Sequence, residues 1–404
     1  DNSTTATFSA ITTAGMFLGA LVGGIIGDKT GRRNAFILYE AIHIASMVVG
    51  AFSPNMDFLI ACRFVMGVGL GALLVTLFAG FTEYMPGRNR GTWSSRVSFI
   101  GNWSYPLCSL IAMGLTPLIS AEWNWRVQLL IPAILSLIAT ALAWRYFPES
   151  PRWLESRGRY QEAEKVMRSI EEGVIRQTGK PLPPVVIADD GKAPQAVPYS
   201  ALLTGVLLKR VILGSCVLIA MNVVQYTLIN WLPTIFMTQG INLKDSIVLN
   251  TMSMFGAPFG IFIAMLVMDK IPRKTMGVGL LILIAVLGYI YSLQTSMLLI
   301  TLIGFFLITF VYMYVCYASA VYVPEIWPTE AKLRGSGLAN AVGRISGIAA
   351  PYAVAVLLSS YGVTGVFILL GAVSIIVAIA IATIGIETKG VSVESLSIDA
   401  VANK

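Results

Sequence analysis

Polar side chains that can bind a small solute lie at helical spacing in the apolar segment 210–236. Lipid penalises such groups, so a polar stripe is expected to face protein or water. Amides and a phenol suit hydroxyl groups or a carboxylate, and a nearby indole suits stacking. The stripe predicts solute contact, with hydrogen bonding between helices as the alternative. Its polar members are Asn222, Gln225, Tyr226 and Asn230, at helical spacing with Ile229 and Pro233, and Trp231 is the nearby indole.

Arg344 is a second candidate for solute contact, one turn after Asn340 in the apolar segment 337–358. An arginine that faces a cavity suits a carboxylate or a hydroxyl-rich anion. The alternatives are that its side chain reaches the membrane surface or pairs with a neighbouring helix. Weaker candidates for the same role are Tyr314 and Tyr317, which form an aromatic patch, and Asn102 and Trp103.

Three further ionisable residues lie inside apolar segments: Glu40, His43 and Arg63. A charge at mid-membrane costs at least about 2.5–3.5 kcal/mol, so each is a functional candidate. Glu40 and His43 share a helix face and can relay protons, although hydrogen bonding between helices is the simpler interpretation. Arg63 is a functional candidate for the same reason, with structural pairing as the alternative.

Charged residues recur at matched positions in the two halves of the chain. The segment 27–33 returns as 268–274, and Glu-x-x-Pro and Arg-Gly pairs follow each copy in the same order. Matched landmarks in one order predict an internal duplication. The charged members are Asp28, Arg32, Arg33, Glu83, Arg90 and Glu149 in the first copy and Asp269, Arg273, Glu325, Arg334 and Glu387 in the second.

The elements that must position these residues are membrane helices. Charged residues make up 12% and hydrophobic residues 56% of the chain, with mean hydropathy +0.76, whereas soluble chains carry about 25% charged residues. A helix needs roughly 20 apolar residues to cross the hydrocarbon core. We predict an all-α membrane protein with spans near 6–26, 35–53, 58–80, 92–118, 126–147, 210–236, 246–268, 275–293, 297–321, 337–358 and 363–385.

The predicted spans and the loops divide the chain into four parts. These are an N-terminal bundle (1–147), a linker with short helices (148–209), a C-terminal bundle (210–386) and a tail (387–404). The linker contains a charged helix near 159–176 with Glu164 and Arg168 one turn apart. Lys and Arg concentrate in one set of loops, which places the linker and C-terminus in the cytoplasm. The duplication predicts twelve spans, of which eleven are present and the first is missing.

Other chemistries find little support in the sequence. The four cysteines fall in apolar segments without metal-ligand spacing, and there is one histidine. No Gly-x-x-x-x-Gly-Lys-Ser/Thr motif predicts a nucleotide-driven motor, and no nucleophile–base–acid set predicts an enzyme. We expect no cofactor, no metal and no nucleic-acid partner, since the net charge of +7 follows from the loops.

The sequence resembles the major facilitator superfamily, and within it the sugar-porter-like metabolite transporters. The motifs that carry the resemblance are segments 24–33, 63–69, 148–154, 324–329 and 387–390. Hexose porters of this family carry paired glutamines where Ala220 and Met221 stand, a tryptophan where Ala320 stands and a proline where Ile386 stands. These departures argue against a hexose substrate, and they leave the fold unaffected.

The resemblance implies two pseudo-symmetric helical bundles in the bacterial inner membrane, working as a monomer by alternating access. The substrate would be a small polar metabolite, such as a sugar, a sugar acid or another carboxylate, moved by proton symport. In the family, the arginine matching Arg63 neighbours the proton site, which makes Arg63 a candidate for coupling. The matched charges of the two halves predict ion pairs that gate the cytoplasmic side, with topology signals and solvated loop charges as the alternative. Proton-driven efflux is the alternative, and a non-transporting membrane sensor a more distant one.

Overall fold

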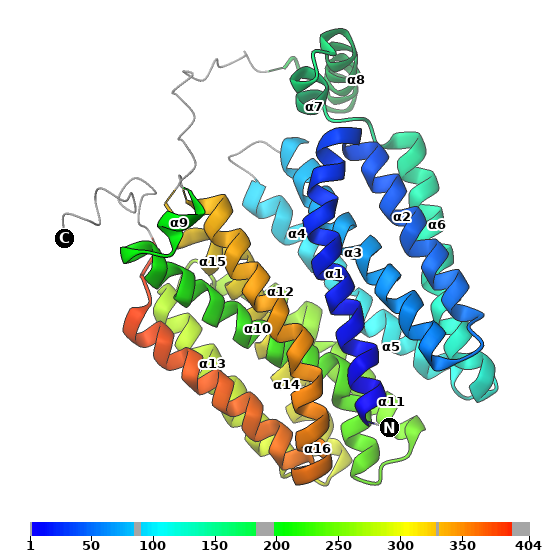
Figure 1. Cartoon of the computed structure of the whole chain (residues 1–404), viewed down its shortest axis with the longest axis vertical. Helices are drawn as coiled ribbons and strands as arrows, with labels where there is room; N and C mark the ends of the chain where they lie inside the picture. The colour runs from blue at the N-terminus through cyan, green and yellow to red at the C-terminus, as the bar shows by residue number, and fades with distance from the viewer. Residues whose placement is uncertain (1, 85–89, 183–197, 329–330, 390–404) are drawn as a thin grey trace. The chain divides into compact units, whose positions relative to one another are not determined.

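The computed structural model describes residues 2–84, 90–182, 198–328 and 331–389, and these residues form helices without a strand (Figure 1). The elements are α1 (Asn2–Thr30), α2 (Arg32–Ala51), α3 (Met56–Tyr84), α4 (Arg90–Asn102), α5 (Ser104–Leu115), α6 (Ala121–Tyr146), α7 (Pro151–Ser156), α8 (Tyr160–Thr178), α9 (Tyr199–Leu202), α10 (Gly205–Thr238), α11 (Leu243–Met254), α12 (Gly256–Val267), α13 (Arg273–Ser292), α14 (Met297–Cys316), the π-helix η2 (Tyr317–Tyr322), α15 (Val323–Glu325) and α16 (Lys332–Ile384).

The predicted spans fall on these helices, and within the described ranges nine helical segments are long and apolar enough to cross a membrane. Two predicted spans are interrupted, at Trp103 between α4 and α5 and at Phe255 between α11 and α12. Each break lies three residues before a proline, Pro106 or Pro258. Proline lacks the backbone N–H and collides with the carbonyl four residues earlier, which accounts for both breaks.

α16 contains the last two predicted spans in one continuous element. The helix bends at Gly362, whose φ of 65° and ψ of −159° are not helical. Only glycine adopts this backbone conformation without strain, so it separates the two spans where the sequence predicted a short loop.

Packing divides the chain into two compact units. Unit 1 comprises residues 1–10, 94–124 and 194–404, and unit 2 comprises residues 11–93 and 125–193. The large apolar core of unit 1 forms where α10 packs along α16, α13 along α16, and α12 along α14. In unit 2, α2 packs along α3. The domain boundaries predicted from the sequence stay a prediction, and the units group α4 and α5 with the C-terminal part.

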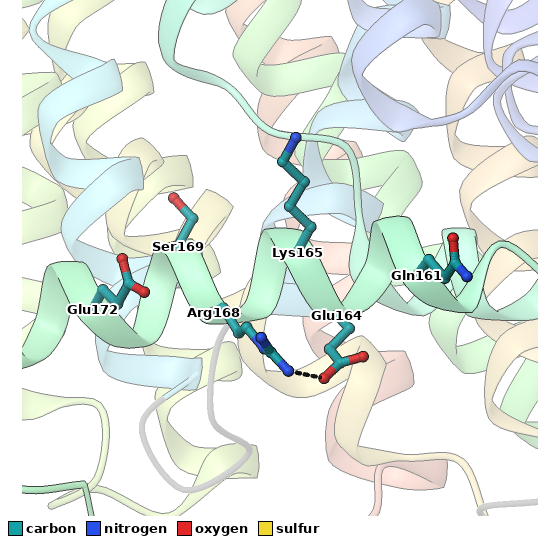
Figure 2. Close-up of a pocket in the computed structure, with 6 residues that line it drawn as sticks. All are labelled: Gln161, Glu164, Lys165, Arg168, Ser169 and Glu172. Atoms are coloured by element: carbon teal, nitrogen blue, oxygen red, sulfur yellow. Dashed lines mark hydrogen bonds and ion pairs between the residues drawn. The ribbon is translucent and has the colours of Figure 1, made fainter.

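The linker forms α7 and α8 in unit 2. Ser150 caps α7 by accepting a hydrogen bond from the Trp153 backbone N–H at 3.3 Å. Ala163 of α8 is buried against Trp153 and Leu154, while the opposite face of α8 is exposed. A surface groove on that face is lined by charged and polar side chains, including the predicted Arg168–Glu164 ion pair at 2.6 Å (Figure 2). The groove therefore belongs to a solvated helix surface outside the spans.

Candidate substrate-contact site and gating clusters

The polar stripe of α10 lies inside unit 1. Asn222 is buried and donates a hydrogen bond from Nδ2 to the Leu218 carbonyl at 2.7 Å. Gln225, Tyr226 and Asn230 are half-buried. Asn222 thus faces protein, and the other three side chains are partly covered, as the cost of polar groups in lipid favours.

Trp231 is fully buried in the apolar core of unit 1, with its Nε1 making no hydrogen bond to a described residue. Its indole packs against core side chains in this conformation, so it presents no open face for stacking. The sequence could not foresee this burial, because the indole follows Asn230 directly and shares the polar end of the stripe.

Arg344, Tyr226 and Gln225 gather with two tyrosines that the sequence did not single out, Tyr105 and Tyr312. The charge of Arg344 acts on the Tyr226 hydroxyl, and Tyr105 also lies near this hydroxyl. The rings of Tyr105 and Tyr312 meet edge-to-face with centroids 5.2 Å apart. The buried Tyr312 hydroxyl lies beside Tyr105 and Gln225 but makes no regular hydrogen bond to a described group. We call these five residues the Arg344 cluster.

One signal in the sequence points to Tyr105. It follows the candidate Asn102 by three residues and precedes Ser109 by four, so Tyr105 and Ser109 share one face of α5. Ser109 accepts a hydrogen bond from Asn250 Nδ2 at 3.4 Å, which ties α5 to α11. The signal at Tyr312 is weaker, because Thr309 is the only polar residue within one turn of it in an otherwise apolar and aromatic stretch of α14.

Close packing at Gly343 fixes Arg344 against α10. A Cβ atom at Gly343 would lie 2.8 Å from the Leu218 Cβ and 3.0 Å from Asn222 Nδ2. These separations are shorter than side chains tolerate, so only glycine lets α16 approach α10 this closely. The residue after it is consequently held beside the polar stripe.

Tyr314 and Tyr317 form an aromatic stack away from the Arg344 cluster. Both are fully buried, with ring centroids 5.7 Å apart, and Tyr317 stacks on Tyr322 at 5.0 Å. The Tyr314 hydroxyl donates to the Val217 carbonyl at 3.1 Å. The pair therefore packs α14 and η2 against α10.

Of the remaining solute-contact candidates, Asn340 and Trp103 are exposed and Asn102 is half-buried. Asn340 is exposed and donates from Nδ2 to the Ser336 carbonyl of its own helix at 2.9 Å. Asn102 similarly donates to the Ser98 carbonyl at 2.7 Å. Trp103 is exposed, and its ring meets Phe255 edge-on at 6.4 Å, so the two interrupted spans touch at their breaks.

The ionisable residues within spans of unit 2 lie on α2 and α3. Glu40 is buried, and its Oε2 makes no hydrogen bond to any described group. His43 Nδ1 lies 3.3 Å from the Met66 carbonyl, and the Arg63 charge acts on its ring. Among the described residues, no hydrogen bond joins Glu40 to His43, so the predicted relay is not formed in this conformation.

A clamp of charged residues closes the end of unit 1 where α13 begins. Arg273 is buried and contacts Glu325 through Nε at 3.0 Å and Asp269 through Nη2 at 3.1 Å. Glu387 accepts hydrogen bonds from the backbone N–H groups of Arg273 at 2.7 Å and Lys274 at 3.1 Å. The Thr388 hydroxyl donates to Glu325 at 2.6 Å. The clamp ties α13, α15 and the chain after α16 together.

Unit 2 repeats this arrangement where α2 begins. Glu149 accepts hydrogen bonds from the backbone N–H groups of Arg32 at 2.6 Å and Arg33 at 3.2 Å. Arg32 pairs with Asp28 at 2.7 Å, as Arg273 pairs with Asp269. Gly31 has φ of 96°, and a Cβ there would lie 2.2 Å from Glu149 Oε2, so this position requires glycine.

Glu149 and Asp28 differ in their surroundings. The Glu149 carboxylate lies at the N-terminus of α2, whereas the side chain of Asp28 is largely exposed and pairs with Arg32. Its backbone carbonyl accepts from Trp153 Nε1 at 2.8 Å and from Arg157 at 2.6 Å. The side chains of Glu83 and Arg90 lie outside the described residues.

Two other predicted gating arginines make local contacts. Arg33 donates to the Trp144 carbonyl at 2.5 Å. The Arg334 guanidinium lies over the Tyr199 ring at 5.1 Å from its centroid. Each arginine thus secures a helix end within its own unit.

Glu387 is held in its charged form by the clamp. Burial works to raise its pKa, but hydrogen bonds from the backbone of Arg273, Lys274 and Lys389 and the charge of Arg273 outweigh burial. The pKa of Glu387 is therefore lowered from the usual value of 4.5. An ionised carboxylate at a helix N-terminus is also favoured by the helix dipole.

Comparison with known proteins agrees with this architecture. Residues 1–400 match the profile of the family described as "Sugar (and other) transporter". The chain is 44% identical over 399 residues to the inner membrane metabolite transport protein YdjE of Escherichia coli K12, covering 98% of this chain and 87% of the relative.

Solved structures of one transporter match the fold. A partially occluded, inward-open structure of the xylose transporter XylE from E. coli gives a TM-score of 0.77 at 18% identity, covering 97% of this chain and 89% of that one. The structure of the proton:xylose symporter XylE bound to 6-bromo-6-deoxy-D-glucose gives a TM-score of 0.66 at 21% identity, covering 97% of this chain and 88% of that one. The predicted all-α membrane fold is confirmed.

Proposed function

Because this chain belongs to the sugar (and other) transporter family of multi-pass membrane proteins, we propose that it is a secondary active transporter. It moves a small polar metabolite across the inner membrane by alternating access, coupled to proton symport. It works as a monomer, with the linker and C-terminus in the cytoplasm. One observation carries the proposal: a polar cluster around Arg344 is built into the apolar helices of unit 1.

The Arg344 cluster supplies what a polar solute needs inside a membrane. The phenols of Tyr226 and Tyr105 and the amide of Gln225 both donate and accept hydrogen bonds. Burying such polar groups among apolar helices costs free energy unless a solute or water forms hydrogen bonds with them. The departures at Ala220 and Met221 argue against a hexose as that solute.

The two clamps support alternating access. In each clamp an arginine stands at the start of a helix, and a glutamate accepts hydrogen bonds from the backbone N–H groups there. The arginine is Arg273 in unit 1 and Arg32 in unit 2, at matched positions of the duplicated sequence. Transport needs two conformations of similar energy. Contacts that form in one conformation and break in the other can supply this switch: an exposed ion pair contributes about 0.2–1 kcal/mol, and a hydrogen bond to a charged group about 1.5–3 kcal/mol.

Proton coupling is supported by Glu40. A buried carboxyl group without a cationic partner among the described residues carries charge only at a high free-energy cost, which proton uptake removes. We expect Glu40→Gln to uncouple uptake from the proton gradient while passive exchange continues. Gradient-driven uptake that is unchanged in Glu40→Gln would remove Glu40 from the coupling site.

Counterflow in proteoliposomes tests the transport proposal. Vesicles are preloaded with one unlabelled solute from a panel of sugars, sugar acids and other carboxylates, and entry of the labelled form is followed. A transporter exchanges at least one solute across the membrane without any energy source. A protein that binds solutes in detergent yet exchanges none of them in vesicles is a sensor, and the proposal fails.

A further inference from the structure

Arg344 lies deep within the membrane-crossing part of α16. Between Lys332 and the bend at Gly362 the helix is about 45 Å long, close to the thickness of a bilayer with its headgroups. Arg344 lies about 18 Å from the first of these residues. A permanent charge at this depth is costly unless an anion balances it.

The part of the chain that the structure describes holds no ion-pair partner for this charge. Among the described residues, no carboxylate lies within ion-pair distance of Arg344, which is half-buried. By contrast, the buried Arg273 has two carboxylate partners. The charge of Arg344 acts on the neutral side chain of Tyr226, and Tyr105 lies near the same Tyr226 hydroxyl.

The position of the charge is also fixed. Gly343 packs against Leu218 and Asn222 so tightly that a Cβ atom at this position would clash with α10. The guanidinium is therefore presented beside the α10 stripe. A preorganised cation with neutral hydrogen-bonding neighbours is the arrangement that binds an anionic group and orients the rest of the molecule.

We propose that Arg344 and Tyr226 form a carboxylate-binding subsite, so that the transported metabolite is an organic carboxylate. This inference rests on the proposed transport function and names its substrate class. The guanidinium fork pairs with both carboxylate oxygens, and the Tyr226 hydroxyl donates to one of them. A single cation balances a monoanion, which favours a carboxylate over a doubly charged phosphate. Tyr105 and Gln225 contact the remainder of the solute.

Matched pairs of solutes test the subsite. The thermal stability of the purified full chain is measured with D-gluconate and D-glucose, nicotinate and nicotinamide, and benzoate and benzamide. At least one carboxylate is expected to raise the melting temperature when its neutral counterpart does not. Loss of the charge-assisted hydrogen bonds in Arg344→Gln should weaken that carboxylate's binding by roughly tenfold to a hundredfold.

Two variants keep the test decisive. Arg168→Gln removes an equal charge from the exposed surface of α8 and should bind like the wild type. Arg344→Lys keeps the charge without the fork and should weaken carboxylate binding by about tenfold. If Arg344→Gln does not elute as a folded monomer on size-exclusion chromatography, carboxylate binding by Arg344→Lys is the result that tests the subsite.

The outcomes separate this inference from the transport proposal. The subsite is overturned if no carboxylate stabilises the protein or if the neutral solutes stabilise it equally. It is also overturned if the Arg344 variants bind the carboxylate as tightly as the wild type. Counterflow of the same solutes is the second arm. Carboxylate binding without exchange refutes transport and leaves the subsite intact, whereas exchange of neutral solutes alone refutes the subsite and leaves transport intact.

Discussion

Replacing Glu387 by glutamine should open the clamp of unit 1. The carboxylate accepts backbone hydrogen bonds from Arg273 at 2.7 Å and from Lys274 and Lys389 at 3.1 Å. Glutamine has one accepting oxygen, so at least one N–H group loses its partner, at about 1–3 kcal/mol. Loss of the negative charge at the start of α13 adds about 0.3–1 kcal/mol. Because the site is partly open to water, we expect a total near 2–3 kcal/mol.

The measurement is the free energy of unfolding in detergent, from denaturant titration at several pH values. Glu387 has a lowered pKa, so its contribution is fully present above the usual value of 4.5 and is lost as the pH falls through the folded-state pKa. The difference between wild type and Glu387→Gln should therefore be largest near neutral pH and shrink below about pH 4.5.

Glu164→Gln is the matched control, because it removes the same charge from an exposed ion pair. Exposed pairs contribute about 0.2–1 kcal/mol. If Glu387→Gln is no less stable than Glu164→Gln at neutral pH, or if its deficit does not change with pH, the reasoning about the clamp is wrong.

Three other substitutions test neighbouring parts of the account. Gly31→Ala should destabilise the protein by about 2–4 kcal/mol in the same titration, because positive φ is strained and the methyl group displaces Glu149; an unchanged stability would contradict the close approach. Gly343→Ala should lower the affinity for transported solute at least tenfold in binding assays, because it pushes α16 away from Leu218; unaltered affinity would show that this packing does not position the site. Asp28→Asn should cut counterflow while changing stability by less than about 1 kcal/mol, since its ion pair is exposed, and full transport would exclude the gate.

The sequence predicted most of the fold, because hydropathy and the duplication depend on local composition. It did not predict the breaks at Trp103 and Phe255, although the prolines that cause them were visible, because prolines elsewhere lie within continuous helices. Pro233 inside α10 is one example. Whether neighbouring helices accommodate a proline is decided by tertiary packing.

The candidate site was predicted in part. Gln225, Tyr226 and Arg344 meet because α10 packs along α16, and both segments carried polar residues against an apolar background. Trp231 turned out to be buried, since periodicity assigns a helix face but not the neighbour that covers it. The hydrogen bond from the Arg32 backbone N–H to Glu149 joins residues 117 positions apart. The motif at 148–154 indicated that Glu149 matters, but it did not indicate which helix N-terminus the carboxylate contacts.

Proton-driven uptake into proteoliposomes tests the central claim most directly. Vesicles of the full chain receive a pH gradient, acid outside, and a labelled solute that the counterflow panel has identified. The account predicts accumulation above the external concentration, lost when a protonophore collapses the gradient. Entry that stops at the external concentration with or without the gradient would contradict proton symport, and accumulation only when the gradient is reversed would assign the protein to efflux.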